Sequence, residues 1–153
     1  KIYPHWQKKI EEVIKFLEEN VKVFKFKAEI KKWETKNFRR RYNNYLKDMD
    51  KYPKKDVIIG FTAISIFWDY PFWNGISCEN KIIVGKMFPI KIPFFDDLDL
   101  KKLVLHEFGH CLRLNDSYFI SFSIMDNFFG IFTSRFTNKQ REIIKKFTEN
   151  LKI

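Results

Sequence analysis

The spacing of apolar and charged positions predicts a helix near the start of the chain. Within residues 6–20, four apolar residues recur at intervals of three or four, with Glu and Lys between them: Ile10, Val13, Ile14 and Leu17. This period places them on one face of an α-helix. We therefore expect that face to contact a core.

Downstream of this helix, the pattern predicts three strands and a second helix. Residues 21–28 alternate apolar side chains with lysines, as a strand does, and residues 37–49 return to a helical period. Residues 57–67 are apolar and β-branched nearly throughout, which is typical of a strand buried on both faces. Residues 69–80 contain Pro, Asn and Gly and predict a loop. Residues 81–88 predict another strand, whose charged ends suit the edge of a sheet.

Two further helices are expected in the second half of the chain. Pro89 and Pro93 precede a strong helical pattern that begins at residues 96–99, where the acids suit a helix N-terminus. Thr137 and Gln140 have the spacing of a capping box and open a last amphipathic helix. This order of elements predicts an α+β fold, with one sheet and helices packed on it.

The length and composition indicate one globular domain over residues 1–153. The chain has 45% apolar and 18% aromatic residues, which excludes a disordered chain. No apolar run approaches the roughly 18 residues of a membrane-spanning helix, so a membrane is not an expected partner.

The only cysteines are Cys78 and Cys111, and the chain opens without a leader, which favours a cytoplasmic over a secreted protein. We expect two buried or half-buried thiols, although a single bridge between them stays open.

The charge is unevenly distributed. The net charge is +10, and residues 1–55 hold 17 Lys/Arg against 8 Asp/Glu. A basic half can bind nucleic acid through phosphate contacts and aromatic stacking, here by Trp33, Phe38, Tyr42 and Tyr45. No recognised nucleic-acid motif is present, so the sequence favours a solvated Lys-rich surface and argues against nucleic acid as the main partner.

A short motif in the helix that begins at residues 96–99 carries the chemistry. His106, Glu107 and His110 form H-E-x-x-H among mostly apolar neighbours. Four residues advance a helix by about one turn, so both imidazoles project from one face about 6 Å apart. That separation suits two positions of a tetrahedral zinc ion, and Glu107 lies where it can take a proton from zinc-bound water. The alternative interpretation is a pair of structural histidines.

A catalytic zinc usually has three protein ligands and a water molecule. Asp116, six residues after the second histidine, is the first candidate for the third ligand. To return Asp116 to the metal, the helix must end around residues 112–114 and the chain must turn sharply. If Asp116 is not a ligand, Asp126, Glu142 or Glu149 could supply the carboxylate from a later segment.

The extended motif resembles that of a known clan of peptidases. The run from His106 to Asp116 is similar to the metzincin motif H-E-x-x-H-x-x-G-x-x-H/D. Ser123, Ile124 and Met125 resemble the Met-turn that lies beneath the metal in that clan. The predicted last helix is similar to the closing helix of matrixins and archaemetzincins.

This resemblance covers roughly residues 20–150, and only residues 106–125 carry specific motifs. It implies a metzincin-like fold: a twisted, mainly parallel sheet with an antiparallel edge strand, packed on helices that include the active-site helix and a C-terminal helix. The upper part would span about 1–110 and the small C-terminal part about 111–153. It also implies one catalytic Zn²⁺, with Met125 as the structural residue of the turn.

Two departures from the family pattern stand out. The family's glycine falls at Arg113, where the turn wants a residue that tolerates positive φ. The cysteine pattern that accompanies the archaemetzincin motif is missing, since Cys111 stands elsewhere. We expect Cys111 to point off the metal face into the core.

The resulting expectation is a zinc metallopeptidase, a hydrolase that cleaves peptide or protein substrates with Glu107 as its catalytic base. An extended substrate would pair with the edge strand at residues 81–87 by β-augmentation. Arg113 keeps open the alternative of a catalytically degenerate zinc-binding scaffold. The oligomeric state is not defined by the sequence.

Overall fold

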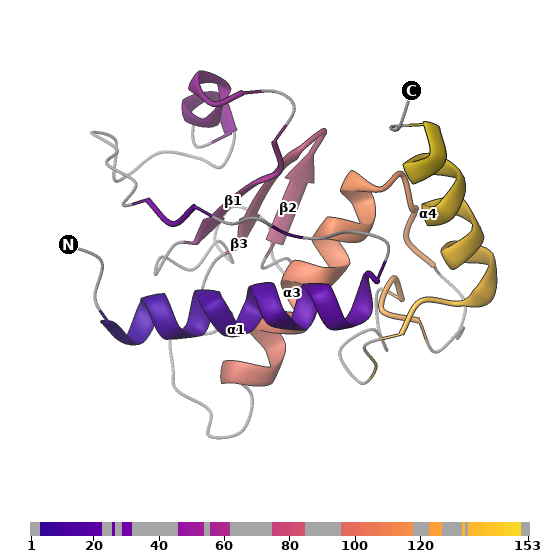
Figure 1. Ribbon diagram of the computed structural model, residues 1–153, viewed down its shortest axis with the longest axis horizontal. Helices are drawn as coiled ribbons and strands as arrows, with labels where there is room; N and C mark the ends of the chain where they lie inside the picture. The colour runs from indigo at the N-terminus through magenta and orange to yellow at the C-terminus, as the bar shows by residue number, and fades with distance from the viewer. Residues whose placement is uncertain are drawn as a thin grey trace.

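The described elements are helices around a small mixed sheet (Figure 1). In the computed structural model the described residues are 4–22, 26, 29–31, 46–53, 56–61, 75–84, 96–117, 123–126, 133 and 135–150. Their elements are α1 (Pro4–Asn20), the 3₁₀ helix η1 (Met49–Lys51), β1 (Ile58–Phe61), β2 (Gly75–Cys78), β3 (Lys81–Val84), α3 (Asp96–Cys111) and α4 (Asn138–Asn150). The predicted α+β class is confirmed at this level.

Helix α1 forms where the helical period predicted it. Val13 and Leu17 are almost fully buried, and the Asn20 side-chain amide donates a hydrogen bond of 2.8 Å to the Phe16 carbonyl at the helix end. Helix α1 packs against α3, with an ion pair of 3.1 Å between Glu12 and Lys101 joining them. The apolar stripe of α1 therefore covers the helix that carries the H-E-x-x-H motif.

The sheet corrects two predictions. Its order is β1-β3-β2, with β1 parallel and β2 antiparallel to β3. The predicted loop at 69–80 contains β2, and the predicted edge strand at 81–88 contains β3, which is central among the described strands. The reason is a two-residue turn that folds β2 back onto β3, so that β2 covers the edge that β3 would otherwise present.

The predicted strand at 57–67 is confirmed in part, since β1 forms its first half. Its residues are half-buried except for buried Gly60, so burial on both faces is wrong for this part. By contrast, β3 contributes Ile82, Ile83 and Val84, each at most 1% exposed. The central strand is thus the one buried on both faces.

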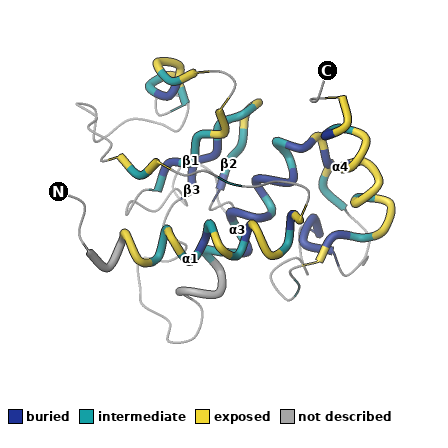
Figure 2. The backbone as a smooth tube through the Cα atoms, viewed as in Figure 1, coloured by how far each residue is buried: buried dark blue, intermediate teal, exposed yellow. Residues whose placement is uncertain are grey.

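Helix α3 lies between the sheet and α1 and is buried for most of its second half (Figure 2). One apolar cluster joins it to the other elements. Its buried members from α1, β3 and α3 include Val13, Leu17, Ile82, Val84, Val104, Leu105 and Phe108. Those from the segments after α3 include Leu112, Leu114, Ile124, Met125, Phe136 and Ile144. The helix that carries the motif is therefore held from both sides.

The capping box at the start of α4 is confirmed. The backbone N–H of Gln140 donates to the Thr137 hydroxyl at 3.2 Å. The backbone N–H of Thr137 donates to the Gln140 side-chain oxygen at 2.8 Å. Ile144 and Thr148 are the buried residues of α4, and its other face is exposed. The last helix is amphipathic, as its sequence predicts.

Several predictions fall wholly or largely outside the described residues. These are most of the strand at 21–28, the helix at 37–49 before residue 46, and the aromatic residues of the nucleic-acid alternative.

Both cysteines are free, and Cys111 is half-buried against the core. Cys78 is exposed, which corrects the expectation of two buried or half-buried thiols. Among the described helices, none combines the length and the hydropathy that a membrane span requires.

Candidate metal centre

The two histidines of the motif lie on the same face of α3, one turn apart. Their ring centroids are 4.9 Å apart and the rings are nearly perpendicular, at 88°. Both side chains are largely buried, with 17% of His106 and 23% of His110 exposed. The helical spacing in the sequence therefore produces a pair of adjacent imidazoles.

Arg113 ends α3 in a left-handed turn. Its φ is 66°, its amide donates to the His110 carbonyl at 2.9 Å, and the Leu114 amide donates to the Gly109 carbonyl at 3.0 Å. These two bonds are those of a Schellman motif, in which this position is usually glycine. Arg113 accepts positive φ there at a cost of about 1–2 kcal/mol. The helix ends at Cys111, just before the predicted range of 112–114, and the predicted sharp turn is confirmed.

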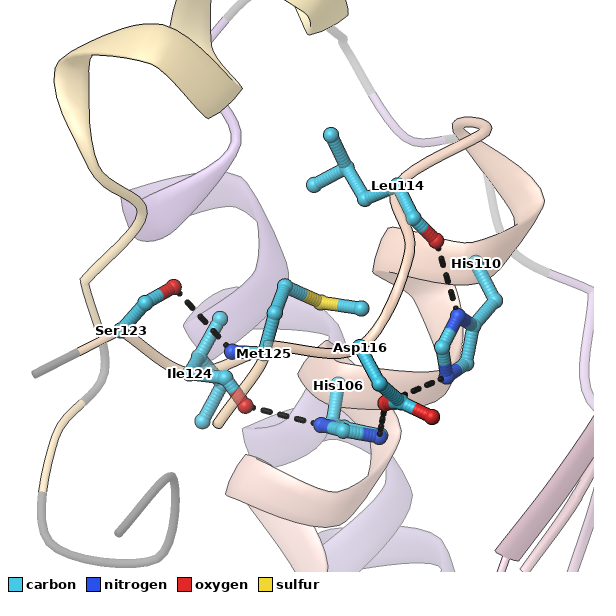
Figure 3. Close-up of polar contacts among 7 residues, drawn as sticks. All are labelled: His106, His110, Leu114, Asp116, Ser123, Ile124 and Met125. Carbon is cyan, nitrogen blue, oxygen red and sulfur yellow. Dashed lines mark hydrogen bonds and ion pairs between the residues drawn. The ribbon is translucent and has the colours of Figure 1, made fainter. Parts of the chain in front are cut away.

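This turn brings Asp116 back to the histidines (Figure 3). Asp116 Oδ1 lies 3.3 Å from His106 Nε2 and 3.3 Å from His110 Nε2. One donor atom from each of the three residues lies within 4.8 Å of the other two. Of the candidate third carboxylates, Asp116 is the one that the structure places beside the histidines.

Backbone carbonyls fix which nitrogen of each imidazole faces Asp116. The Ile124 carbonyl lies 2.8 Å from His106 Nδ1, and the Leu114 carbonyl lies 2.9 Å from His110 Nδ1. A carbonyl oxygen only accepts, so each Nδ1 must carry the hydrogen and donate it. In the neutral imidazoles both Nε2 lone pairs then point towards the Asp116 carboxylate.

Three electron-pair donors in such proximity require protons or a cation between them. Apart from the two imidazole nitrogens, buried Asp116 Oδ1 has no polar partner among the described residues. In a tetrahedral site with bonds of about 2.0–2.1 Å, neighbouring ligand atoms are about 3.3–3.4 Å apart. The separation of 3.3 Å from Asp116 Oδ1 to each Nε2 matches that spacing. The three side chains therefore fit a small divalent metal ion.

The electrostatics of the metal-free site agree with this geometry. Burial lowers the pKa of His106, but Asp116, the Ile124 carbonyl and Glu107 outweigh burial, so the net shift is upward. His106 lowers the pKa of Asp116, against the effect of burial, and His110 adds to the lowering. The site thus attracts positive charge, as a proton or as a metal ion.

The segment 123–126 lies beside this cluster (Figure 3). Met125 is fully buried, and a methyl group on Gly109 of α3 would collide with its sulfur. The Ser117 amide, next to Asp116, donates to the Met125 carbonyl at 2.8 Å. The Met125 amide in turn donates to the Ser123 hydroxyl at 3.2 Å. The turn therefore supports the chain beside Asp116 and supplies, through Ile124, the carbonyl that orients His106.

Glu107 faces β2, where its carboxylate lies against Gly75. It is 4% exposed; burial raises its pKa, and His106 and a hydrogen bond from Ser77 oppose the rise. A Cβ atom on Gly75 would lie 2.7 Å from Glu107 Cγ and Oε1, so only glycine leaves room for this carboxylate. Gly75 and Ser77 were not expected at this site, because the glycine lies in a segment whose composition predicts a loop.

A pocket of about 410 Å³ connects Glu107 to the metal cluster. It is lined by Ile76, Ser77, Glu107, His110, Arg113, Leu114, Asn115 and Asp116. One wall comes from the strand β2 and the floor comes from α3 and the turn after it. The pocket therefore places a buried carboxylate beside His110 and Asp116, two of the three candidate metal ligands.

The other candidate carboxylates serve elsewhere. Asp126 Oδ2 accepts the Ser123 amide at 3.0 Å within the turn. Glu142 is exposed on α4, and Glu149 lies 3.9 Å from Lys145 on the same helix. Among the described residues, none of the three belongs to the cluster that could hold a metal ion.

No protein-family model, curated protein or solved structure matches this chain.

Proposed function

We propose that this protein is a zinc-dependent peptidase of the metzincin type. The observation that carries the proposal is the convergence of His106, His110 and Asp116 on one point, beside a pocket that also contains Glu107. The order of the motif, the left-handed turn and the methionine beneath it is that of the metzincins. The small mixed sheet and the helices that flank it are compatible with that fold.

Zinc is the metal that this donor set favours. Two imidazoles and one carboxylate form a set of three ligands that leaves a position open, which is typical of catalytic zinc sites. Each histidine is oriented through Nδ1 by a backbone carbonyl, as is usual for metal-binding imidazoles. When bound, zinc would lower the pKa of water and polarise a substrate carbonyl group.

Glu107 is the residue that would move the proton. It would accept a proton from the attacking water and later give it to the leaving amine nitrogen of the cleaved peptide bond. A raised pKa suits both steps, because the carboxylate must hold the proton between them. Ser77 and Gly75 would act by positioning: the first holds the carboxylate, and the second leaves room for it.

Strand β2 would bind the substrate backbone. It is at the edge of the described sheet, and Ile76 and Ser77 line the pocket. An extended peptide can add to such an edge by main-chain hydrogen bonds. The sequence suggested residues 81–87 as the strand that pairs with substrate; we propose β2 for this role instead.

The test compares wild type with Glu107→Gln, each loaded with zinc. A mixed peptide library is incubated with both proteins, cleavage is read by mass spectrometry, and metal content is measured by elemental analysis. We expect one zinc per chain in both proteins and cuts by wild type that Glu107→Gln makes at least about 10³-fold more slowly. Glu142→Gln, an exposed Glu on α4, is the matched control and should cleave like wild type.

Other outcomes have distinct meanings. Cuts that persist in Glu107→Gln would overturn the role of Glu107. One bound zinc and no cuts by wild type would instead support the alternative of a zinc-binding scaffold, which the unusual Arg113 turn favours.

A further inference from the structure

Among the described residues that line the pocket, Arg113 is the one lysine or arginine. Arg113 is exposed, and within the part of the chain that the structure describes, its guanidinium makes no ion pair or hydrogen bond. The two carboxylates of the same pocket are engaged elsewhere: Glu107 with Ser77, and Asp116 with the histidines. Arg113 thus brings unused donors to the rim of the pocket.

The backbone at Arg113 strengthens this point. The Schellman turn requires positive φ, which glycine adopts without strain and arginine does not. A strained residue at the edge of a functional site suggests that its side chain has a use. The positive side chain also lies near the negative end of the α3 dipole, so a purely structural role is the alternative to test.

We propose that Arg113 binds a carboxylate of the substrate and so makes this a peptidase for peptides that carry an acidic group close to the cleaved bond. The proposal rests on the proposed function. A guanidinium binds a carboxylate through two parallel hydrogen bonds, which fixes its position as well as its charge. Ile76 and Leu114 supply the apolar surface beside it. The net charge of +10 would attract such peptides to the protein.

The carboxylate has two possible sources, and matched peptides separate them. In the first pair of libraries, one library contains Asp and Glu and the other has Asn and Gln at the same positions. This pair tests whether the carboxylate belongs to an acidic side chain. A second pair differs in a free C-terminus against a C-terminal amide, which tests the terminal carboxylate. Retention of these peptides is measured on zinc-loaded Glu107→Gln, which does not need to cleave them, and kcat/KM is measured on the active protein.

We expect Glu107→Gln to retain the carboxylate-bearing member of at least one pair about 10-fold to 100-fold more tightly than its neutral counterpart. When Arg113→Gln is combined with Glu107→Gln, the double variant should lose this preference. Its affinity for neutral peptides should stay within about twofold of that of Glu107→Gln. Arg113→Lys should keep part of the preference, because the charge remains without the planar fork. Arg135→Gln is the matched control: Arg135 is exposed, does not line the pocket, and loses the same charge.

Each outcome bears on the proposal. Equal binding of charged and neutral peptides would overturn it, as would a preference that survives Arg113→Gln. A lower melting temperature of Arg113→Gln with an unchanged preference would leave Arg113 a structural role only. If wild type cleaves peptides without any preference, the peptidase stands and this inference fails. If Glu107→Gln shows the preference but wild type cleaves nothing, the carboxylate site stands and the peptidase fails.

Discussion

At the scale of single residues, two described glycines near the candidate centre, Gly75 and Gly109, each leave room for a side chain of that centre. Gly75 on β2 faces Glu107, and Gly109 on α3 faces Met125. In both places an added Cβ would overlap an atom of the neighbouring residue. The absence of a side chain at these positions is therefore part of how the site is built.

We predict that Gly75→Ala separates catalysis from metal binding. Its Cβ would lie 2.7 Å from Glu107, so the carboxylate must move. Overpacking of this kind costs about 1–3 kcal/mol of stability, and a displacement of about 1 Å can cost about 100-fold in rate. Peptide cleavage should fall while zinc content stays at the wild-type level. A cleavage rate equal to that of wild type would show that Glu107 tolerates the methyl group.

The two thiols should differ in reactivity. Cys78 is exposed, whereas burial raises the pKa of Cys111 to about 12, with Glu107 adding to the rise. The thiolate is the reactive form, so a thiol reagent at about pH 8 should modify one cysteine per folded chain. Peptide mapping should locate the modification at Cys78, and Cys78→Ser should remove the fast reaction. Equal modification of both thiols in the folded protein would contradict this expectation.

At the scale of elements, α4 is hydrogen-bonded to the turn at residues 123–126, beside the candidate metal centre. The Ser123 hydroxyl donates to the Gln140 side-chain oxygen at 2.5 Å, and the same oxygen accepts the Thr137 amide that caps α4. Ser123 also accepts the Met125 amide. A path of hydrogen bonds therefore leads from the start of α4 into the segment whose Ile124 carbonyl orients His106.

We predict that Gln140→Ala weakens both α4 and the metal site. Loss of the cap should cost about 1 kcal/mol in the free energy of unfolding. Loss of the bond to Ser123 should loosen the turn and lower zinc affinity by about tenfold, as changes behind metal ligands do. Lys139→Ala, an exposed neighbour on α4, is the control and should change neither quantity. Urea denaturation and zinc titration measure the two effects, and unchanged zinc affinity would show that α4 does not support the turn.

At the scale of the whole molecule, the candidate centre joins distant parts of one core. The cluster that packs α1, β3 and α3 together also includes Met125, Leu114 and Ile144. A metal ion that binds the folded chain and not the unfolded chain would stabilise all of these elements together, by mass action.

We therefore predict that zinc raises the melting temperature. At a free zinc concentration of about 100 times its Kd, the gain is about 2.7 kcal/mol, or roughly 5–10 °C for a chain of this size. Asp116→Asn should remove most of the effect. Differential scanning fluorimetry with and without a chelator measures the shift, and an equal shift in Asp116→Asn would exclude Asp116 as a ligand.

The zinc effect should also depend on pH. Because the pKa of His106 is raised, its protonated form stabilises the metal-free fold at low pH, and this contribution is lost as pH rises through that pKa. Zinc binds only the neutral imidazole, so the stabilisation that zinc provides increases as pH rises. The difference in melting temperature between zinc-loaded and metal-free protein should therefore grow from about pH 5 to about pH 8. A difference that is constant with pH would argue against histidine ligands.

The sequence by itself determined the local features. His106 and His110 are separated by about one helical turn, so their spacing places them on the same face of the helix. The capping box from Thr137 to Gln140 spans four residues. Both depend on interactions between near neighbours, so the pattern was sufficient to predict them. The sharp turn after the helix was predicted from the need to return Asp116 to the histidines, and the φ of 66° at Arg113 agrees.

Only the tertiary structure decided which strand borders the pocket and how the site is supported. The placement of β2 beside β3 follows from strand pairing, which no short window of sequence encodes. The same holds for Gly75 and Ser77 against Glu107, and for the Ile124 carbonyl on His106, which lies 18 residues away along the chain. These contacts exist because the apolar faces of α1, α3 and the sheet must be buried together, and that burial brings distant residues into one site.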